Sequence, residues 1–183
     1  MNSRNIERLE TWDRLLDHLI STFYYRFRHQ LKLPFDSLDN EPVIRFGGFI
    51  LEEPWIDEKG KVRVRCGWHN REPHCRLGKL TIFTRHIYLN RLFLYHQLGL
   101  QVYYLDSAEF TTLFNLDNLI RVLAHELGHT VLTDTKPETQ EINGGHGKEH
   151  DKISEELVNL IEKSEEVKEL KKYRKINQKN LYE

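Results

Sequence analysis

The chain has 183 residues, of which 39% are hydrophobic and 11% aromatic, and its formal net charge is −1. This composition supports a real hydrophobic core and excludes global disorder, and the near-zero charge gives no overall case for a nucleic-acid or membrane-surface protein. The two cysteines, Cys66 and Cys75, exclude a disulfide framework, and the charged N-terminus and short apolar runs exclude a signal peptide and a membrane span, so a cytoplasmic protein is expected.

We expect one domain over residues 1–183, with a core over roughly residues 4–165 and a solvated polar tail over 170–183. The domain begins with a predicted amphipathic helix over residues 4 to about 31. The apolar side chains of this helix recur every three or four positions, which is the period of one helix face. They are Leu9, Trp12, Leu15, Leu16, Leu19, Ile20, Phe23 and Phe27. A stripe this rich in aromatic residues indicates core packing rather than a cofactor site.

Three strands are predicted next, over residues 43–51, 61–68 and 79–90. In the second, Val62 and Val64 alternate with charged residues, which is typical of a half-buried strand. Residues 52–60 carry the glycine and the charges expected of a hairpin connection. Residues 91–114 have a weaker pattern, with one or two helical turns followed by a short strand over 101–107.

The clearest predicted helix covers residues 115–134. Its buried face consists of Leu116, Leu119, Ile120, Leu123, Leu127 and Val131. Asn115 or Asp117 can cap its start, and Pro137 prevents a long continuation. After a polar loop over 132–145, a long helix is predicted from Lys148. Its apolar stripe consists of Ile153, Leu157, Leu160, Ile161 and Val167.

The helix over 115–134 contains the run His125-Glu126-Leu127-Gly128-His129, an H-E-x-x-H motif. Because residues four apart share one helix face, His125 and His129 project together and can bind one zinc ion. Glu126 can then act as general base toward a zinc-activated water that attacks a carbonyl. Gly128 removes a side chain where another element can pack close. The alternative is two unrelated histidines, but the strongly apolar, well-capped helix favours a zinc site.

A catalytic zinc usually has three protein ligands and one water. The metzincin motif would need glycine and histidine where this chain has Leu132 and Thr135, so that class is excluded. Three candidates for the third ligand remain near the start of the next helix, where they can share one face. They are His146, Glu149 and His150.

The order of an H-E-x-x-H helix, a polar loop and Gly-His-Gly before a helix resembles the SprT-like (Spartan-like) zinc metalloproteases. The matching segments are HELGH at 125–129 and GHGKEH at 145–150, and the likeness covers roughly residues 79–155. The resemblance implies His146 as the third zinc ligand, Glu126 as the catalytic base and proteins bound to DNA as substrates. The chain departs from the family at His150, where an aromatic residue is common, and no cysteine-rich zinc ribbon follows.

Glu149 stays open as the third ligand, because its spacing from His129 resembles that of thermolysin-type proteases, although its neighbours do not match their second motif. A structural zinc site is a further alternative, built from four side chains within ten residues. These are Cys66, His69, His74 and Cys75. The adjacent His-Cys pair is awkward for tetrahedral ligation, which favours ordinary loop and core roles.

Residues 59–91 are strongly basic with interleaved aromatic residues, a pattern that can contact DNA, although a solvated strand face is the alternative. The predicted fold is α+β and zincin-like, with a small sheet packed on the H-E-x-x-H helix and flanking N- and C-terminal helices. The expected function is a zinc-dependent metalloprotease with Zn²⁺ as cofactor and a protein or peptide as substrate. The alternative is a nucleic-acid-associated or other binding protein that uses zinc structurally.

Overall fold

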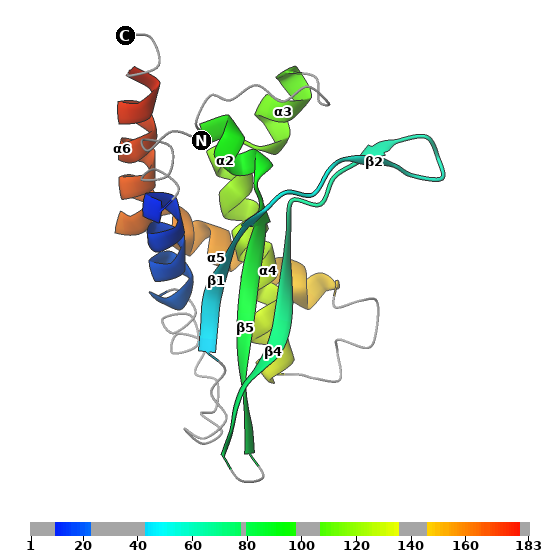
Figure 1. The fold of residues 1–183 in the computed structure, drawn as a ribbon, viewed down its shortest axis with the longest axis vertical. Helices are drawn as coiled ribbons and strands as arrows, with labels where there is room; N and C mark the ends of the chain where they lie inside the picture. The colour runs from blue at the N-terminus through cyan, green and yellow to red at the C-terminus, as the bar shows by residue number, and fades with distance from the viewer. Residues whose placement is uncertain (1–9, 23–42, 78–79, 98–106, 136–145, 180–183) are drawn as a thin grey trace.

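A computed structural model describes residues 10–22, 43–77, 80–97, 107–135 and 146–179 (Figure 1). The fold is α+β, as predicted, with a mixed three-stranded sheet packed against helices. The sheet consists of β1 (Val43–Ile50), β4 (Gly67–Leu77) and β5 (Leu80–Asn90) in the order β1-β5-β4. β1 runs parallel to β5 and β4 runs antiparallel to it. The predicted strands over 43–51 and 79–90 are therefore confirmed as β1 and β5.

The predicted strand over 61–68 is not one continuous strand, although its last two residues, Gly67 and Trp68, begin β4. Its first residues belong to a separate two-stranded hairpin of β2 (Trp55–Ile56) and β3 (Val62–Arg63), which projects away from the body of the protein (Figure 1). Val62 is 55% exposed, so its alternation with charged residues does not reflect a half-buried strand. Gly60 has a φ of +73° at the hairpin turn, a conformation that favours glycine.

Strand β4 was missed in a segment that the sequence favoured as a loop. It contains few apolar residues and carries Pro73 within it. The pairing register of β4 with β5 shifts between Pro73 and Cys75, and a bulge is a place where a strand tolerates proline. In the part of the sheet that the structure describes, β4 is an edge strand, where the pattern of buried residues is weakest.

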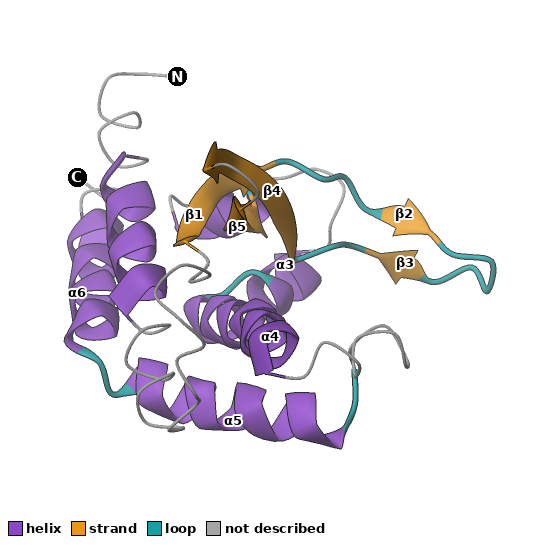
Figure 2. Ribbon diagram, turned by 90° about the horizontal axis from the view of Figure 1, so that it is seen from below, coloured by secondary structure: helices purple, strands orange, loops and turns teal. Residues whose placement is uncertain are grey.

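The helices lie below and beside the sheet, as Figure 2 shows: α4 lies under the sheet, and α5 lies under α4. α6 and the described part of the N-terminal helix flank these layers. The helices with their bounds are α2 (Leu92–Gln97), α3 (Ser107–Leu113), α4 (Leu116–Thr135), α5 (Lys148–Glu162) and α6 (Glu165–Lys179). None of these described helices is long and apolar enough to cross a membrane.

The predicted N-terminal helix is confirmed over residues 10–22, and the rest of 4–31 lies outside the described residues. Its stripe joins a continuous core with the sheet, α4 and the C-terminal helices. Buried members of this core from the N-terminal helix are Trp12, Leu16, Leu19 and Ile20. The predicted short strand over 101–107 lies almost wholly outside the described residues, and residue 107 begins α3.

The long C-terminal helix is broken in two, which the sequence analysis did not predict. Ser164 ends α5 and caps α6, because its Oγ accepts a hydrogen bond of 3.1 Å from the Val167 backbone N–H. The same hydroxyl donates to the Ile161 carbonyl oxygen at 2.7 Å. Two acidic residues follow in the first turn of α6, where they complement the helix dipole. This break lets α6 return beside the N-terminal helix (Figure 2).

Candidate metal centre

Helix α4 presents the H-E-x-x-H residues from a buried and well-capped position. Asn115 caps the helix, since its Oδ1 accepts a hydrogen bond of 2.8 Å from the Asn118 backbone N–H. The predicted apolar face is buried at Leu116, Leu119, Ile120, Leu123 and Leu127. This packing fixes the orientation of the helix, so that the positions of His125 and His129 are set by the core.

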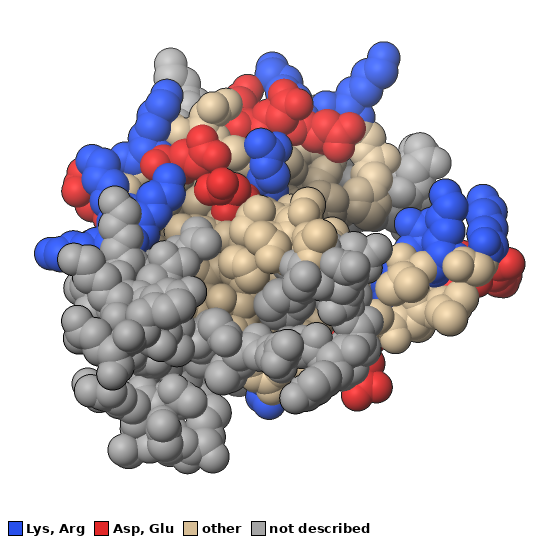
Figure 3. All heavy atoms as spheres, turned by 90° about the horizontal axis from the view of Figure 1, so that it is seen from above, with Lys and Arg blue, Asp and Glu red and all other residues tan. Residues whose placement is uncertain are grey.

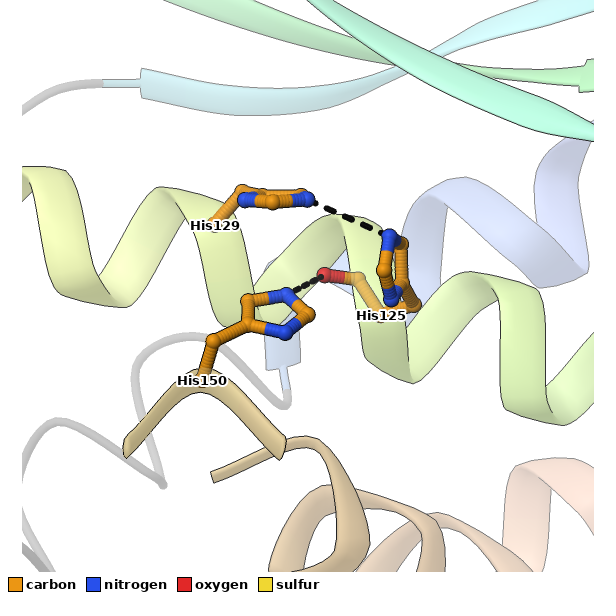
Figure 4. A group of neighbouring side chains, drawn as sticks. All are labelled: His125, His129 and His150. Carbon is orange, nitrogen blue, oxygen red and sulfur yellow. Dashed lines mark hydrogen bonds between the residues drawn. The ribbon is translucent and has the colours of Figure 1, made fainter. Parts of the chain in front are cut away.

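His125 and His129 project together, one turn apart, as the sequence predicts (Figure 4). Their Nε2 atoms lie 3.2 Å apart, and their ring planes are perpendicular. His129 is 6% exposed, whereas His125 is half-buried. Two imidazole nitrogens therefore meet at the surface of α4.

His146, immediately before α5, brings a third imidazole to the same point. Its Nε2 lies 3.2 Å from the Nε2 of His125, and its ring centroid lies 4.7 Å from that of His129. Two zinc ligands at Zn–N distances of about 2.0–2.1 Å in a tetrahedron lie about 3.3–3.4 Å from each other. A neutral imidazole can donate only one proton, so the Nε2 atom of His125 cannot donate to both neighbours. Three imidazole nitrogen atoms at this spacing could hold one metal ion.

His150 lies in the first turn of α5 and is buried, with 1% of its surface exposed. Its ligand atom lies within 4.8 Å of those of His125 and His129, and this group of three fits a zincin-like metal site. Its Nε2 lies 3.1 Å from the His125 backbone carbonyl oxygen (Figure 4). Its ring packs against that of His129, with centroids 4.1 Å apart. Two sets of three histidines are thus available, which share His125 and His129.

Burial keeps His125 and His129 in the neutral form that binds metal ions. Burial, together with the nearby His150, His125, His69 and His146, lowers the pKa of His129 to about 3. Burial also lowers the pKa of His125. Neutral imidazoles carry the lone pair that a metal ion needs, so both side chains are ready as ligands at neutral pH.

Gly128 allows α5 to pack closely on α4, as predicted. A Cβ atom at this position would lie 2.8 Å from the Ser154 Oγ and 3.3 Å from the His150 Nε2. A larger residue at position 128 would therefore clash with α5, at the point where α5 places His150 beside the other histidines. The absence of a side chain at Gly128 thus sets the distance between the two helices that supply the histidines.

Glu126 contacts a residue whose proximity was not predicted from the sequence. Its Oε2 lies 2.8 Å from the Nδ1 of His69 on strand β4, a position 57 residues earlier in the chain. The ring of His69 also lies 5.2 Å from that of His129, centroid to centroid. Nothing in the sequence pairs these positions, because β4 itself was missed. The pairing depends on the strand crossing α4 at this point.

A cleft of about 540 Å³ opens beside His125, between α4 and α5. Its lining includes Arg121, Asp151, Ser154, Val158 and Glu162. Clefts of roughly 300–1,000 Å³ are of the size that holds small ligands or substrate side chains. Of the clustered histidines, His125 is the one that lines this cleft.

The other predicted site residues lie as follows. Glu149 is exposed in the first turn of α5, and its carboxylate is not part of the group of three histidines. Cys66 packs against the core, and burial raises the pKa of its thiol to about 11. The side chains of His74 and Cys75 lie outside the described residues. His69 contacts Glu126, so its side chain is directed to α4.

Several arginines in the basic stretch over 59–91 have partners within the protein. Arg63 pairs with Asp57 at 2.7 Å and Arg65 with Glu52 at 3.4 Å. Arg85 is buried and donates to the Thr130 carbonyl oxygen. On the face shown in Figure 3, acidic and basic side chains are interspersed. Binding of DNA by this stretch stays a prediction.

Comparison with models of known protein families, with curated proteins and with solved structures found no match for the chain.

Proposed function

We propose that the protein is a zinc-dependent metalloprotease of the SprT-like type, with zinc held by His125, His129 and His146. One observation carries the proposal: the Nε2 atoms of His129 and His146 each lie 3.2 Å from that of His125. That spacing is close to the edge of a tetrahedral zinc site, about 3.3–3.4 Å. The H-E-x-x-H motif places Glu126 next to the first of these histidines.

We assign the third ligand position to His146 rather than His150 because the Nε2 of His146 lies 3.2 Å from that of His125. A carbonyl oxygen can only accept, so the Nε2 of His150 must carry a proton to donate to the His125 carbonyl. A protonated nitrogen has no lone pair for a metal ion. The other nitrogen, Nδ1, is buried and has no hydrogen-bond partner in the part of the chain that is described. His150 could therefore bind a metal ion only through Nδ1, and we propose that it instead holds α5 against α4.

Several features of the fold support a protease. The edge strand β4 crosses the helix that carries the histidines, and an extended peptide can pair with such an edge. The cleft of about 540 Å³ beside His125 can receive a substrate side chain. A small sheet above an H-E-x-x-H helix is also the arrangement that we expected for a zincin-like fold.

A bound zinc ion would polarise the scissile carbonyl and lower the pKa of a water molecule to about 7. Glu126 would take the proton from the attacking water and pass it to the leaving amine. Glu126 as a whole residue is only 6% exposed, which limits the access of bulk solvent to it. The neutral imidazoles of His125 and His129 provide the lone pairs of the site.

The decisive experiment compares Glu126→Gln with the wild-type protein in metal content and in cleavage of a fluorogenic peptide library. Glutamine preserves the shape of the side chain but cannot accept a proton, so we expect full zinc content and a rate loss of about 10²–10⁴-fold or more. Glu169→Gln, at an exposed position on α6, is the matched control and should keep full activity. Wild-type cleavage by Glu126→Gln would refute the role of Glu126.

The proposal includes DNA-associated proteins as substrates. This part of it rests on the resemblance to the SprT-like family alone. Salt-dependent binding of single-stranded DNA by the Glu126→Gln protein would favour them.

A further inference from the structure

We propose that His69 is a positioning residue that orients the carboxylate of Glu126, an inference that depends on the proposed metalloprotease function. The Nδ1 of His69 and the Oε2 of Glu126 lie 2.8 Å apart, a good hydrogen-bond distance. An ionised carboxylate only accepts, so Nδ1 is the donor. The carboxylate comes from α4, whereas the imidazole comes from the sheet, so the contact joins two separate elements.

The backbone of His69 is held by pairing with β5 and by the close approach of β4 to α4. His69 pairs with Ile87 across β4 and β5, and Ile87 is fully buried. Paired residues on antiparallel strands point to the same face, so His69 faces α4 together with the core residue Ile87. The chain enters β4 at Gly67, where a Cβ atom would lie 2.5 Å from the Val122 Cγ1 and 3.5 Å from the Glu126 Cγ. The strand can approach α4 this closely because Gly67 has no side chain.

This contact gives Glu126 a defined orientation. The side chain of Glu126 is 9% exposed, and a buried carboxylate needs hydrogen bonds to offset its lost hydration. Without a partner, the terminal torsion of a glutamate is broad. Holding Oε2 on His69 leaves the second oxygen, Oε1, to act on the attacking water. His69 therefore acts through Glu126 and needs no contact with the substrate.

Three substitutions of His69 separate this role from a general structural one. In asparagine, Nδ2 occupies the position of the imidazole Nδ1, two bonds from Cβ, whereas the amide nitrogen of glutamine lies one bond further out. We expect His69→Asn to stay within about fivefold of the wild-type kcat. His69→Gln and His69→Ala should lower kcat by about 10–100-fold with little change in KM, since misplacing a reacting group by about 1 Å costs about 10²-fold. In a Glu126→Gln background, His69→Ala should cause no further loss.

Two readouts do not depend on activity. Long-range ¹H–¹⁵N spectra of the full-length protein should show His69 as the Nδ1–H tautomer, and this signal should change in Glu126→Ala. Zinc affinity, measured by competition with a chelator, should be the same within about threefold for wild type and all three His69 variants, because His69 supports the base and not the metal.

The outcomes distinguish the two proposals. Loss of zinc by His69→Ala would show that His69 is a ligand. Equal kcat values for all three variants would show that His69 has no positioning role. Either result overturns the inference. If the Nδ1–H tautomer is found but wild-type protein cleaves no peptide, the proposed function fails, and the catalytic role of His69 falls with it although the hydrogen bond stands. If the protein cleaves peptides but Nδ1 carries no proton, the positioning role alone is refuted.

Discussion

The imidazole of His150 donates a hydrogen bond of 3.1 Å to the backbone carbonyl oxygen of His125. This bond joins the first turn of α5 to the middle of α4, across 25 positions of the chain. It anchors the segment that carries His146, four residues before His150, beside the Nε2 of His125. The buried histidine thus helps to determine where His146 meets the site.

The first prediction separates the three candidates for the third zinc ligand by titration of single variants. His146→Ala should weaken zinc affinity most, because it removes a nitrogen from the site. His150→Ala should weaken it by about 10–100-fold, the usual effect of losing a residue that supports a ligand. Glu149→Gln should leave affinity unchanged, since this side chain is exposed and outside the histidine group.

Zinc titrations followed by competition with a chelator measure all three affinities. Full zinc retention by His146→Ala, together with loss in Glu149→Gln or His150→Ala, would transfer the ligand role to that residue.

The second prediction concerns the stability gained from the metal. A ligand that binds only the folded state at 100 times its Kd stabilises that state by about 2.7 kcal/mol. For a domain of this size we expect zinc to raise Tm by about 5–10 °C over chelator-treated protein. His129→Ala should abolish this difference, because it removes one of the ligands. An equal Tm shift in His129→Ala would show that zinc binds elsewhere.

The parts of the fold that could be predicted are those with a strong local signal. Helix α4 follows from the period of its apolar residues and from Asn115, which caps it as expected. Strand β4 could not be predicted, because an edge strand with one proline and many polar residues has no burial pattern of its own. The break at Ser164 did have a signal, namely a serine followed by two glutamates, which is typical of a helix start.

The candidate site also has parts that the sequence predicts and parts that it does not. His125 and His129 share one helix, so their spacing alone predicts that their side chains meet. His150 was considered only as a ligand, and the hydrogen bond to a backbone carbonyl has no trace in the sequence. His69 was considered as a possible member of a structural zinc site with Cys66, but an ordinary loop role was favoured. Its contact with Glu126 depends on how the sheet lies on α4, which is a tertiary property.

The third prediction tests the close packing of α5 on α4. In an ordinary helix interior, Gly→Ala stabilises by about 1 kcal/mol. At Gly128 the new Cβ would lie 2.8 Å from the Ser154 Oγ and 3.3 Å from the His150 Nε2. We therefore expect Gly128→Ala to lower the free energy of unfolding by about 1–3 kcal/mol, as overpacking does, and to weaken zinc binding.

Ser154→Ala provides the control for Gly128→Ala. The Ser154 Oγ is buried without a hydrogen-bond partner in the described part of the chain, so its removal alone should cost little. In the double variant the closest contact is gone, and part of the lost stability should return. Urea unfolding of the four proteins measures this coupling. Additive effects of the two substitutions would show that the helices are not in contact at this point.

The last prediction concerns the reactivity of Cys66. Burial raises the pKa of its thiol to about 11, because a buried thiolate loses its hydration. The thiolate is the form that reacts, and at pH 8 a thiol of pKa 11 is about 0.1% ionised, against roughly a fifth for a free cysteine. We expect Cys66 in the folded protein to react with iodoacetamide at least tenfold more slowly than in urea, with a rate that still rises between pH 8 and pH 10. A Cys75→Ser background isolates this signal, and mass spectrometry over time measures it. Equal rates in folded and unfolded protein would show that Cys66 is not packed against the core, and a rate that levels off near pH 8 would show that its pKa is not raised.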